Sequence, residues 1–145
     1  MMPEKKKFEK IDTNDFVSGV IEDIQREKEH ESIYKGVTSV KDCVRFIFKI
    51  DGYKDYHYSG WMLFAYGKKC NLFTKYLVSL IEGALPYMNF DLDQLKGMKV
   101  KMLWQNNPNS EYQHIETIRP FDGKKLIPII NDESVEEEPI DEVPF

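Results

Sequence analysis

The stretch CVRFIFKI, residues 43–50, decides the fold of this chain. Apolar residues recur at every second position, and this period places successive side chains on opposite faces of a β-strand. One face takes Val44, Phe46, Phe48 and Ile50, and the other takes Arg45, Ile47 and Lys49. We therefore predict a strand with one buried apolar face and a second face that carries two cations in solvent.

The next segment completes a hairpin with this strand. Asp51-Gly52 opens a turn over residues 51–55, and Tyr56–Tyr66 supplies the partner strand. The register that keeps both cations in solvent pairs Ile50 with Tyr56. It sets Phe48 opposite Tyr58, Phe46 opposite Gly60 and Val44 opposite Met62 inside, with Lys49 opposite His57, Ile47 opposite Ser59 and Arg45 opposite Trp61 outside. A slip by one residue turns Tyr58 and Phe64 outward and Trp61 inward, and the turn leaves both registers open.

The flanking segments predict three more strands and one helix. Strands are predicted at residues 16–24, with Gly19 as a bulge, and at residues 98–104 and 112–119. A charged segment at 26–41 is interpreted as an extension of the first strand at its start and then a long connecting loop. The apolar segment 124–130 is expected to lie across the body. A helix is predicted between a cap at Asn71 and a stop at Gly83, with Phe73, Tyr76, Leu77, Leu80 and Ile81 on its buried side.

This order of elements indicates a known architecture. Three strands, a helix and two strands form the order of the OB-fold, a mostly β, five-stranded Greek-key barrel with its helix between strands 3 and 4. Such barrels bind oligonucleotides or oligosaccharides on the face of strands 2 and 3, flanked by two loops. The candidate nucleic-acid-binding residues are Arg45, Ile47, Lys49, His57 and Trp61 on that face, Tyr34 and Lys35 in one loop, Tyr112 beside the other, Tyr56 at the hairpin tip, and Lys99 and Lys101 on another strand.

Cations and aromatic rings on one surface suit unpaired nucleic acid. Cations follow the phosphates, and flat rings stack on bases of any sequence with roughly 1–3 kcal/mol per base. Arg45 beside Trp61 and Lys49 beside His57 would interleave these two properties. The alternative is that these side chains only cover a solvated strand face.

The carboxyl-terminal segment has a different composition. Residues 132–145, DESVEEEPIDEVPF, hold seven of the 25 acidic residues and none of the 20 Lys and Arg, which leaves 18 acids against 20 bases elsewhere. Self-repulsion and two prolines predict a disordered tail. We expect a 1–14 flexible arm, a 15–131 binding domain and a 132–145 tail whose last residue, Phe145, enters an apolar pocket of a partner.

The tail resembles the tip of a known protein family. Asp141, Glu142, Val143, Pro144 and Phe145 are similar to the acidic, Pro-Phe ending of bacterial and phage single-stranded DNA-binding proteins. The resemblance covers about ten residues and implies an OB-fold body that coats single-stranded DNA. It also implies that the tip recruits replication, recombination and repair proteins.

Several function classes lack support in the sequence. Phosphate-binding glycine loops, dinucleotide fingerprints and HExxH are absent, so we expect no enzyme and no metal or cofactor. Cys43 and Cys70 stand apart, and no apolar run spans a bilayer, so we expect a cytoplasmic protein without membrane contact. The alternatives that stay open are a protein-interaction adaptor, an enzyme or its accessory subunit with a site assembled in space, and a barrel that binds RNA or oligosaccharide.

Overall fold

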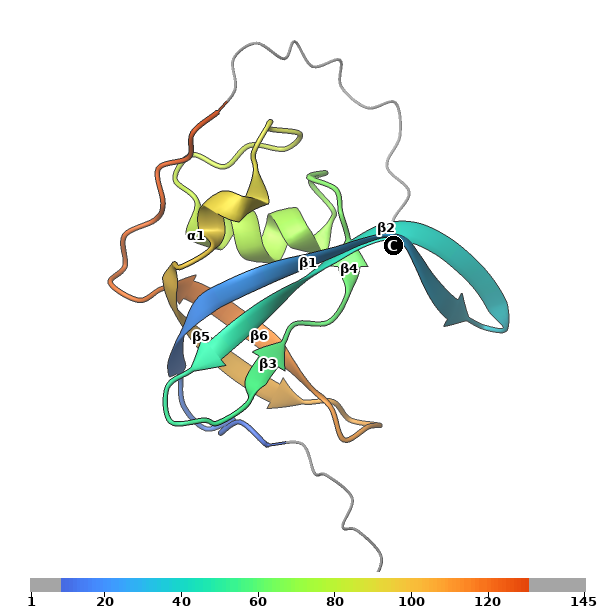
Figure 1. Ribbon diagram of the computed structural model, residues 1–145, viewed down its shortest axis with the longest axis horizontal. Coiled ribbons are helices and arrows are strands. Elements are labelled where there is room, and N and C mark those ends of the chain that lie inside the picture. Colours follow the sequence, from blue (N-terminus) through green and yellow to red (C-terminus); the bar gives the residue numbers. More distant parts are fainter. Residues whose placement is uncertain (1–8, 131–145) are drawn as a thin grey trace, which may run out of the picture.

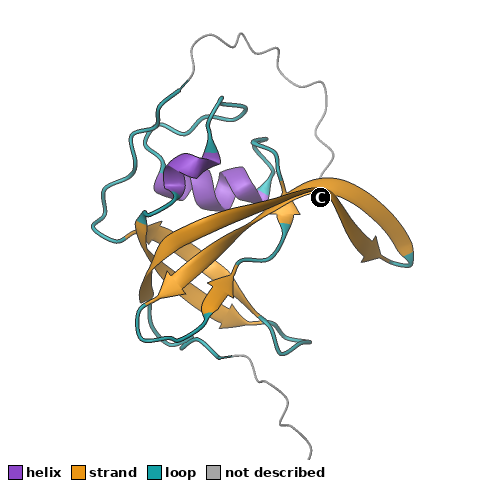
Figure 2. Ribbon diagram, in the orientation of Figure 1, coloured by secondary structure: helices purple, strands orange, loops and turns teal. Residues whose placement is uncertain are grey.

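A mostly β architecture is seen in the computed structural model, which describes residues 9–130 (Figures 1 and 2). The predicted tail and its tip lie outside the described residues. The strands are β1 (Val17–Tyr34), β2 (Val37–Ile50), β3 (Tyr56–Tyr58), β4 (Met62–Leu63), β5 (Lys99–Asn106) and β6 (Gln113–Pro120). They form one antiparallel open sheet in the order β3-β2-β1-β5-β6, with β4 paired to β2.

The first two strands form a hairpin that is much longer than predicted. β1 and β2 pair from Gly19–Ile50 out to Tyr34–Val37, so the segment 26–41 is a two-stranded ribbon and not a loop. Positive φ angles at Lys35 (52°) and Gly36 (77°) close the tight turn. The distal half of the ribbon extends away from the body (Figure 1).

A close approach between strands surrounds Gly19. A Cβ atom there would lie 2.7 Å from the carbonyl oxygen of Lys49, a separation below 3.0 Å that real Cβ atoms essentially never show. Glycine is therefore required by backbone packing, while the bulge predicted at Gly19 lies further along, between Ile21 and Asp23.

The β2–β3 register differs from the predicted one because the partner strand is interrupted. Val44 pairs with Met62 as predicted, but further along β2 the partners are Ile47–Tyr58 and Lys49–Tyr56. The one-residue shift falls between β3 and β4. Both Tyr58 and Trp61 therefore lie on the outer face, which a regular strand does not allow for residues three apart.

The buried face of β2 organises the core as predicted. Phe46 and Phe48 are fully buried, and the Phe46 ring meets Tyr76 edge-on with ring centroids 4.6 Å apart. Tyr76 comes from a helical segment that begins as the π-helix η1 (Leu72–Leu77) and ends as α1 (Val78–Leu80). Asn71 makes no side-chain cap hydrogen bond, and the helix ends before the predicted Gly83. A short 3₁₀ turn, η2 (Leu92–Leu95), precedes β5.

The segment 124–130 crosses the body as predicted. Leu126 donates its N–H to the carbonyl of Leu80 at 2.8 Å and accepts from Glu82 N–H at 2.8 Å. Ile130 forms a bridge with Phe90. The chain thus passes beside the end of α1 and across η2. There the Gln94 side chain donates to the Ile129 carbonyl and accepts from the Ile129 N–H.

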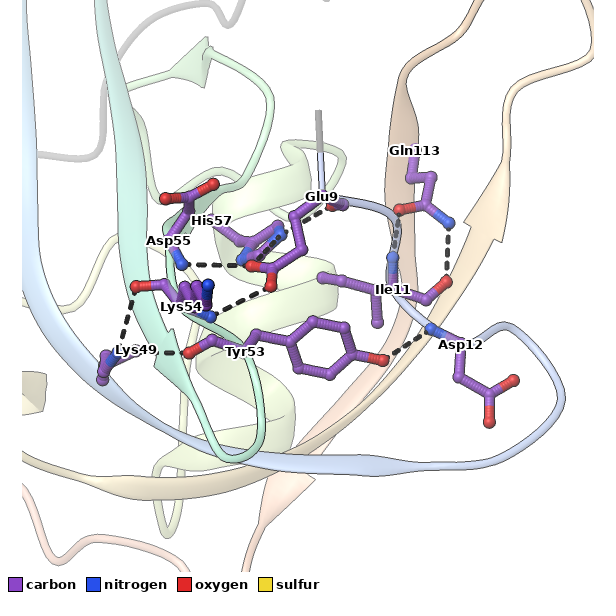
Figure 3. A network of polar contacts seen from close by, with 9 residues as sticks. All are labelled: Glu9, Ile11, Asp12, Lys49, Tyr53, Lys54, Asp55, His57 and Gln113. Atoms are coloured by element: carbon purple, nitrogen blue, oxygen red, sulfur yellow. Dashed lines mark hydrogen bonds and ion pairs between the residues drawn. The ribbon is translucent and has the colours of Figure 1, made fainter. Parts of the chain in front are cut away.

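Residues 9–12 connect the two outermost strands of the sheet, β3 and β6 (Figure 3). The Glu9 carbonyl accepts from His57 Nε2 on β3 at 2.9 Å, and the backbone of Ile11 exchanges two hydrogen bonds with the Gln113 side chain on β6. Ile11 itself is buried in the core. This part of the predicted flexible arm is therefore fixed to the body, and residues 1–8 lie outside the described part of the chain.

Candidate nucleic-acid interface

The outer face of β2 and its partner segment brings cations and aromatic rings together. Arg45 and Lys49 project from β2, Tyr56 and Tyr58 from β3, and Trp61 from the segment before β4. We call these five residues the aromatic–cation face. Tyr56 is 50% exposed and Tyr58 43%, so both rings are accessible to a ligand.

Arg45 lies at the centre of this face. Its guanidinium carbon is 4.3 Å from the centroid of the Tyr58 ring and 4.7 Å from that of Trp61. Its Nε donates to the neutral amide oxygen of Gln25 at 2.7 Å. That hydrogen bond orients the guanidinium without cancelling its charge.

Arg26, the other arginine nearby, differs from Arg45 because a carboxylate neutralises its charge. Arg26 is ion-paired with Asp42 at 2.6 Å, and the carboxylate raises the pKa of the guanidinium above its ordinary value. The Arg26 side chain also lies over the Phe64 ring, 4.1 Å from its centroid. Of the two, Arg45 is therefore the one suited to a phosphate.

Trp61 is held in place by two neighbours. Besides Arg45, the His30 ring from β1 stacks on it with ring centroids 4.7 Å apart. Both neighbours and the register shift between β3 and β4 fix the orientation of the indole, which is only partly exposed. A base that stacks on Trp61 would have to displace one of them.

Lys49 and Ile47 complete the surface along β2. Lys49 Nζ donates to the carbonyls of Tyr53 and Lys54 at 3.2 and 3.3 Å, and lies 5.9 Å from the Tyr56 ring centroid. Both hydrogen-bond partners are neutral carbonyls, and the ammonium also interacts electrostatically with the Glu9 carboxylate. Ile47 is 8% exposed and forms the apolar floor between the two cations.

The prediction that His57 belongs to the binding face is wrong, because the register shift turns its side chain inward. It pairs with the buried Phe48, and its ring is 6.2 Å from that of Trp104, centroid to centroid. Its Nε2 donates to the Glu9 carbonyl at 2.9 Å (Figure 3). His57 therefore holds the segment 9–12 in place and does not belong to the aromatic–cation face.

Two further groups of predicted residues lie away from this face. Tyr34 and Lys35 are at the tip of the β1–β2 ribbon, remote from the body (Figure 1). Tyr112 is 55% exposed and precedes β6, at the opposite edge of the sheet from β3. Tyr34 and Lys35 therefore lie apart from Arg45, and Tyr112 adjoins the margin of β6 that residues 9–12 join to β3.

Lys99 and Lys101 are on β5 and share the outer side of the sheet. Val20 of β1 is the direct partner of both Lys49 and Lys99, so these three side chains leave the sheet on the same side. Lys101 follows two residues after Lys99 and has the same orientation.

Sequence reasoning missed Tyr58, Gln25 and His30. The preferred register placed Tyr58 in the core, and only the alternative register turned it outward. The observed register shift places it on the outer face. Gln25 lies between the predicted strand 16–24 and the segment 26–41, and His30 lies within that segment, whereas both are on β1 opposite β2. The ribbon they occupy has no apolar periodicity, so no sequence signal marked it as a strand.

Other chemistries find little support in residues 9–130. This part of the chain contains no group of three His, Cys, Asp or Glu side chains placed to hold a metal ion. Burial raises the pKa of the Cys43 thiol, which disfavours a reactive thiolate. Within the same range, no helix has the length and apolarity needed to cross a membrane.

Comparisons with known proteins do not assign the chain to a family. No protein-family model, curated protein or solved structure matches it.

Proposed function

We propose that this protein binds single-stranded DNA without sequence preference and recruits replication, recombination and repair proteins through its acidic tail. The observation that carries the proposal is the position of Arg45 between the exposed Tyr58 ring and Trp61 on the outside of a curved sheet. A cation at the centre of accessible rings offers phosphate neutralisation and base stacking within one nucleotide's reach.

The relative energies of the contacts favour an exchange on binding. An exposed cation–π contact is worth about 0.5–1 kcal/mol, whereas a base stacked on an aromatic side chain is worth about 1–3 kcal/mol. A base can therefore replace Arg45 on the Tyr58 ring with a net gain. The released guanidinium remains beside the ring, where it can bind the phosphate of the same nucleotide.

The strand order supports an OB-type body. β1 pairs with both β2 and β5, and β5 pairs with β6, as the first, second, fourth and fifth strands of such a barrel do. In this interpretation β3 and β4 together take the place of the third strand. Residues 9–12 fill the position where the third and fifth strands would otherwise meet.

The tail supports the recruitment part of the proposal by its sequence alone. An acidic segment that carries Val143, Pro144 and Phe145 offers an apolar ring and carboxylates to a partner with an apolar pocket and a basic rim. Removing Phe145 is expected to abolish partner capture while DNA binding by the body persists.

A direct titration tests the DNA-binding proposal. Fluorescence anisotropy with labelled oligo-dT, duplex DNA and single-stranded RNA is measured on the full chain, and oligo-dT is expected to bind most tightly. Tyr58→Ala and Arg45→Gln should each weaken oligo-dT binding by about tenfold. The matched controls Leu85→Ala and Lys68→Gln change an exposed apolar side chain and an exposed cation elsewhere. Equal effects of variants and controls, or no oligo-dT binding by the wild type, would refute the proposal.

An adaptor that does not bind nucleic acid is the second candidate, and one observation favours it. Ile127 and Ile129 are 79% and 78% exposed on the segment that leads toward the tail. Such side chains are typical of a surface covered by a partner. Absence of oligo-dT binding, together with retained capture of a partner through residues 127–145, would favour this function.

A further inference from the structure

A second group of rings and cations lies on the outer side of the sheet, on β5, on β6 and the residue after it, and on the residue before β1. Arg119 lies over the Phe16 ring at 4.3 Å from its centroid, and Lys101 Nζ lies 5.2 Å from the centroid of Phe121. Phe121 is 46% exposed. We call Phe16, Lys99, Lys101, Arg119 and Phe121 the β5–β6 cluster.

The pairing of the strands shows that this cluster faces the same side as Arg45. Lys101 is the direct partner of both Ser18 and Arg119, and Lys99 is the direct partner of Val20, which also pairs with Lys49. Direct cross-strand partners project from the same side of a sheet. The aromatic–cation face and the cluster are thus two parts of one continuous outer surface, joined where Lys49, Val20 and Lys99 lie side by side.

The size of this surface exceeds what one or two nucleotides need. Five strands at about 4.8 Å spacing extend roughly 19 Å from β3 to β6 around the curved sheet. A groove of about 610 Å³ adjoins the cluster and is lined by Lys99, Phe121, Lys124 and Lys125, among others. The surface therefore stays basic and partly aromatic beyond the first face.

Three carboxylates near this path have hydrogen-bond or ion-pair partners. Asp23, opposite Ile47 on the outer side, is ion-paired with Lys96 at 3.1 Å. Asp15 and Asp122, which adjoin Phe16 and Phe121 in sequence, accept backbone N–H groups at 2.8 and 2.9 Å. Of the three, only Asp23 has a counter-charge, and this ion pair reduces the repulsion that a phosphate chain would meet where β1 and β2 adjoin.

The geometry points to a second single-strand-binding subsite at the β5–β6 cluster, so that a long strand passes from Tyr58 across Lys49 and Lys99 to Phe121 and Arg119. The inference rests on the proposed function and extends it, because it assigns a path around the sheet. Alternating phosphates and bases match both the cations and the rings of the cluster. The acidic segment 132–145 carries a single aromatic ring, Phe145, whereas the cluster holds two, Phe16 and Phe121.

Two lengths of oligo-dT separate the subsites. The full chain is titrated with dT of about 5 nucleotides, which the aromatic–cation face can hold alone, and with dT of about 16 nucleotides, which can reach the cluster. The ratio of the two affinities is then compared among wild type, Phe121→Ala, Arg119→Gln, and the controls Leu85→Ala and Lys68→Gln. Phe121→Tyr keeps a ring at the same place, and thermal unfolding confirms that each variant is folded.

Phe121→Ala and Arg119→Gln are expected to reduce the affinity ratio of long to short oligo-dT by about fivefold or more, and Phe121→Tyr to restore it. An unchanged ratio, or one changed equally by the controls, overturns the inference while the proposed function stands. Failure of both lengths to bind the wild type refutes the proposed function itself. If a peptide of residues 132–145 binds and Arg119→Gln weakens only this peptide, the cluster takes acidic peptide and the inference is wrong.

Discussion

Gly19→Ala is expected to destabilise the domain by about 1–3 kcal/mol, the range typical of overpacking in a buried site. The added Cβ would lie 2.7 Å from the Lys49 carbonyl oxygen and 3.1 Å from the Ile50 Cα. Both neighbours are backbone atoms of β2, so no side-chain rotation can relieve the clash. The Lys49 carbonyl oxygen must move about 0.7 Å away from the added Cβ, from 2.7 to 3.4 Å, to restore an ordinary van der Waals contact.

Gly60→Ala is the matched control for this substitution. No atom lies within 4 Å of a Cβ built on Gly60, and its φ is not in the left-handed region. Alanine there should change the free energy of unfolding by less than about 1 kcal/mol, because it mainly restricts the unfolded chain.

Urea unfolding followed by tryptophan fluorescence measures both variants, since Trp104 is buried in the core. Gly19→Ala should lower the urea midpoint at an unchanged m-value, and Gly60→Ala should leave it close to that of the wild type. Equal stability of the two variants would refute the close approach of β1 and β2. Gly19 precedes Val20, which lies between Lys49 and Lys99 where the aromatic–cation face joins the β5–β6 cluster. Displacing β1 from β2 there should therefore also lower the affinity for long oligo-dT.

Two further predictions concern the segments at either end of the domain. The Glu9 carboxylate accepts hydrogen bonds from the backbone N–H groups of Lys54 and Asp55. These bonds lower the pKa of Glu9 below its ordinary value, and the bond from Lys54 has the larger effect. A lowered folded-state pKa stabilises the protein above the unfolded value and loses this effect as pH falls. Glu9→Gln should therefore be less stable than wild type near neutral pH and equally stable in acid, and a constant difference in urea titrations across pH would contradict this. Deletion of residues 132–145 removes seven negative charges and should tighten oligo-dT binding, most strongly at low salt, so unchanged or weaker low-salt affinity would refute it.

The sequence predicted the parts of the fold that depend on alternation and helical spacing. Val44, Phe46, Phe48 and Ile50 are fully buried, and Phe73, Tyr76 and Leu80 cover them from the helix. These residues carry a strong periodic signal, because a strand or helix on a core needs one apolar face.

The errors arose where long-range contacts override the local pattern. The segment 26–41 lacks apolar alternation because neither face of the ribbon packs on the core, so its charges were taken for a loop. His57 and Tyr58 exchanged sides because the shift between β3 and β4 has no marker beyond Gly60. The fixed position of residues 9–12 depends on Gln113 and His57, which are distant in sequence.

The bridge made by residues 9–12 has a consequence for solubility. Strands at the margin of an open sheet present unsatisfied amides and carbonyls that can recruit strands from other molecules. Here residues 9–12 cover the gap between the margins of β3 and β6, and the Ile11 side chain packs in the core between them. A protein shortened to begin after Asp12 would lose this shield, and we expect it to self-associate sheet to sheet at concentrations where the longer chain stays dispersed.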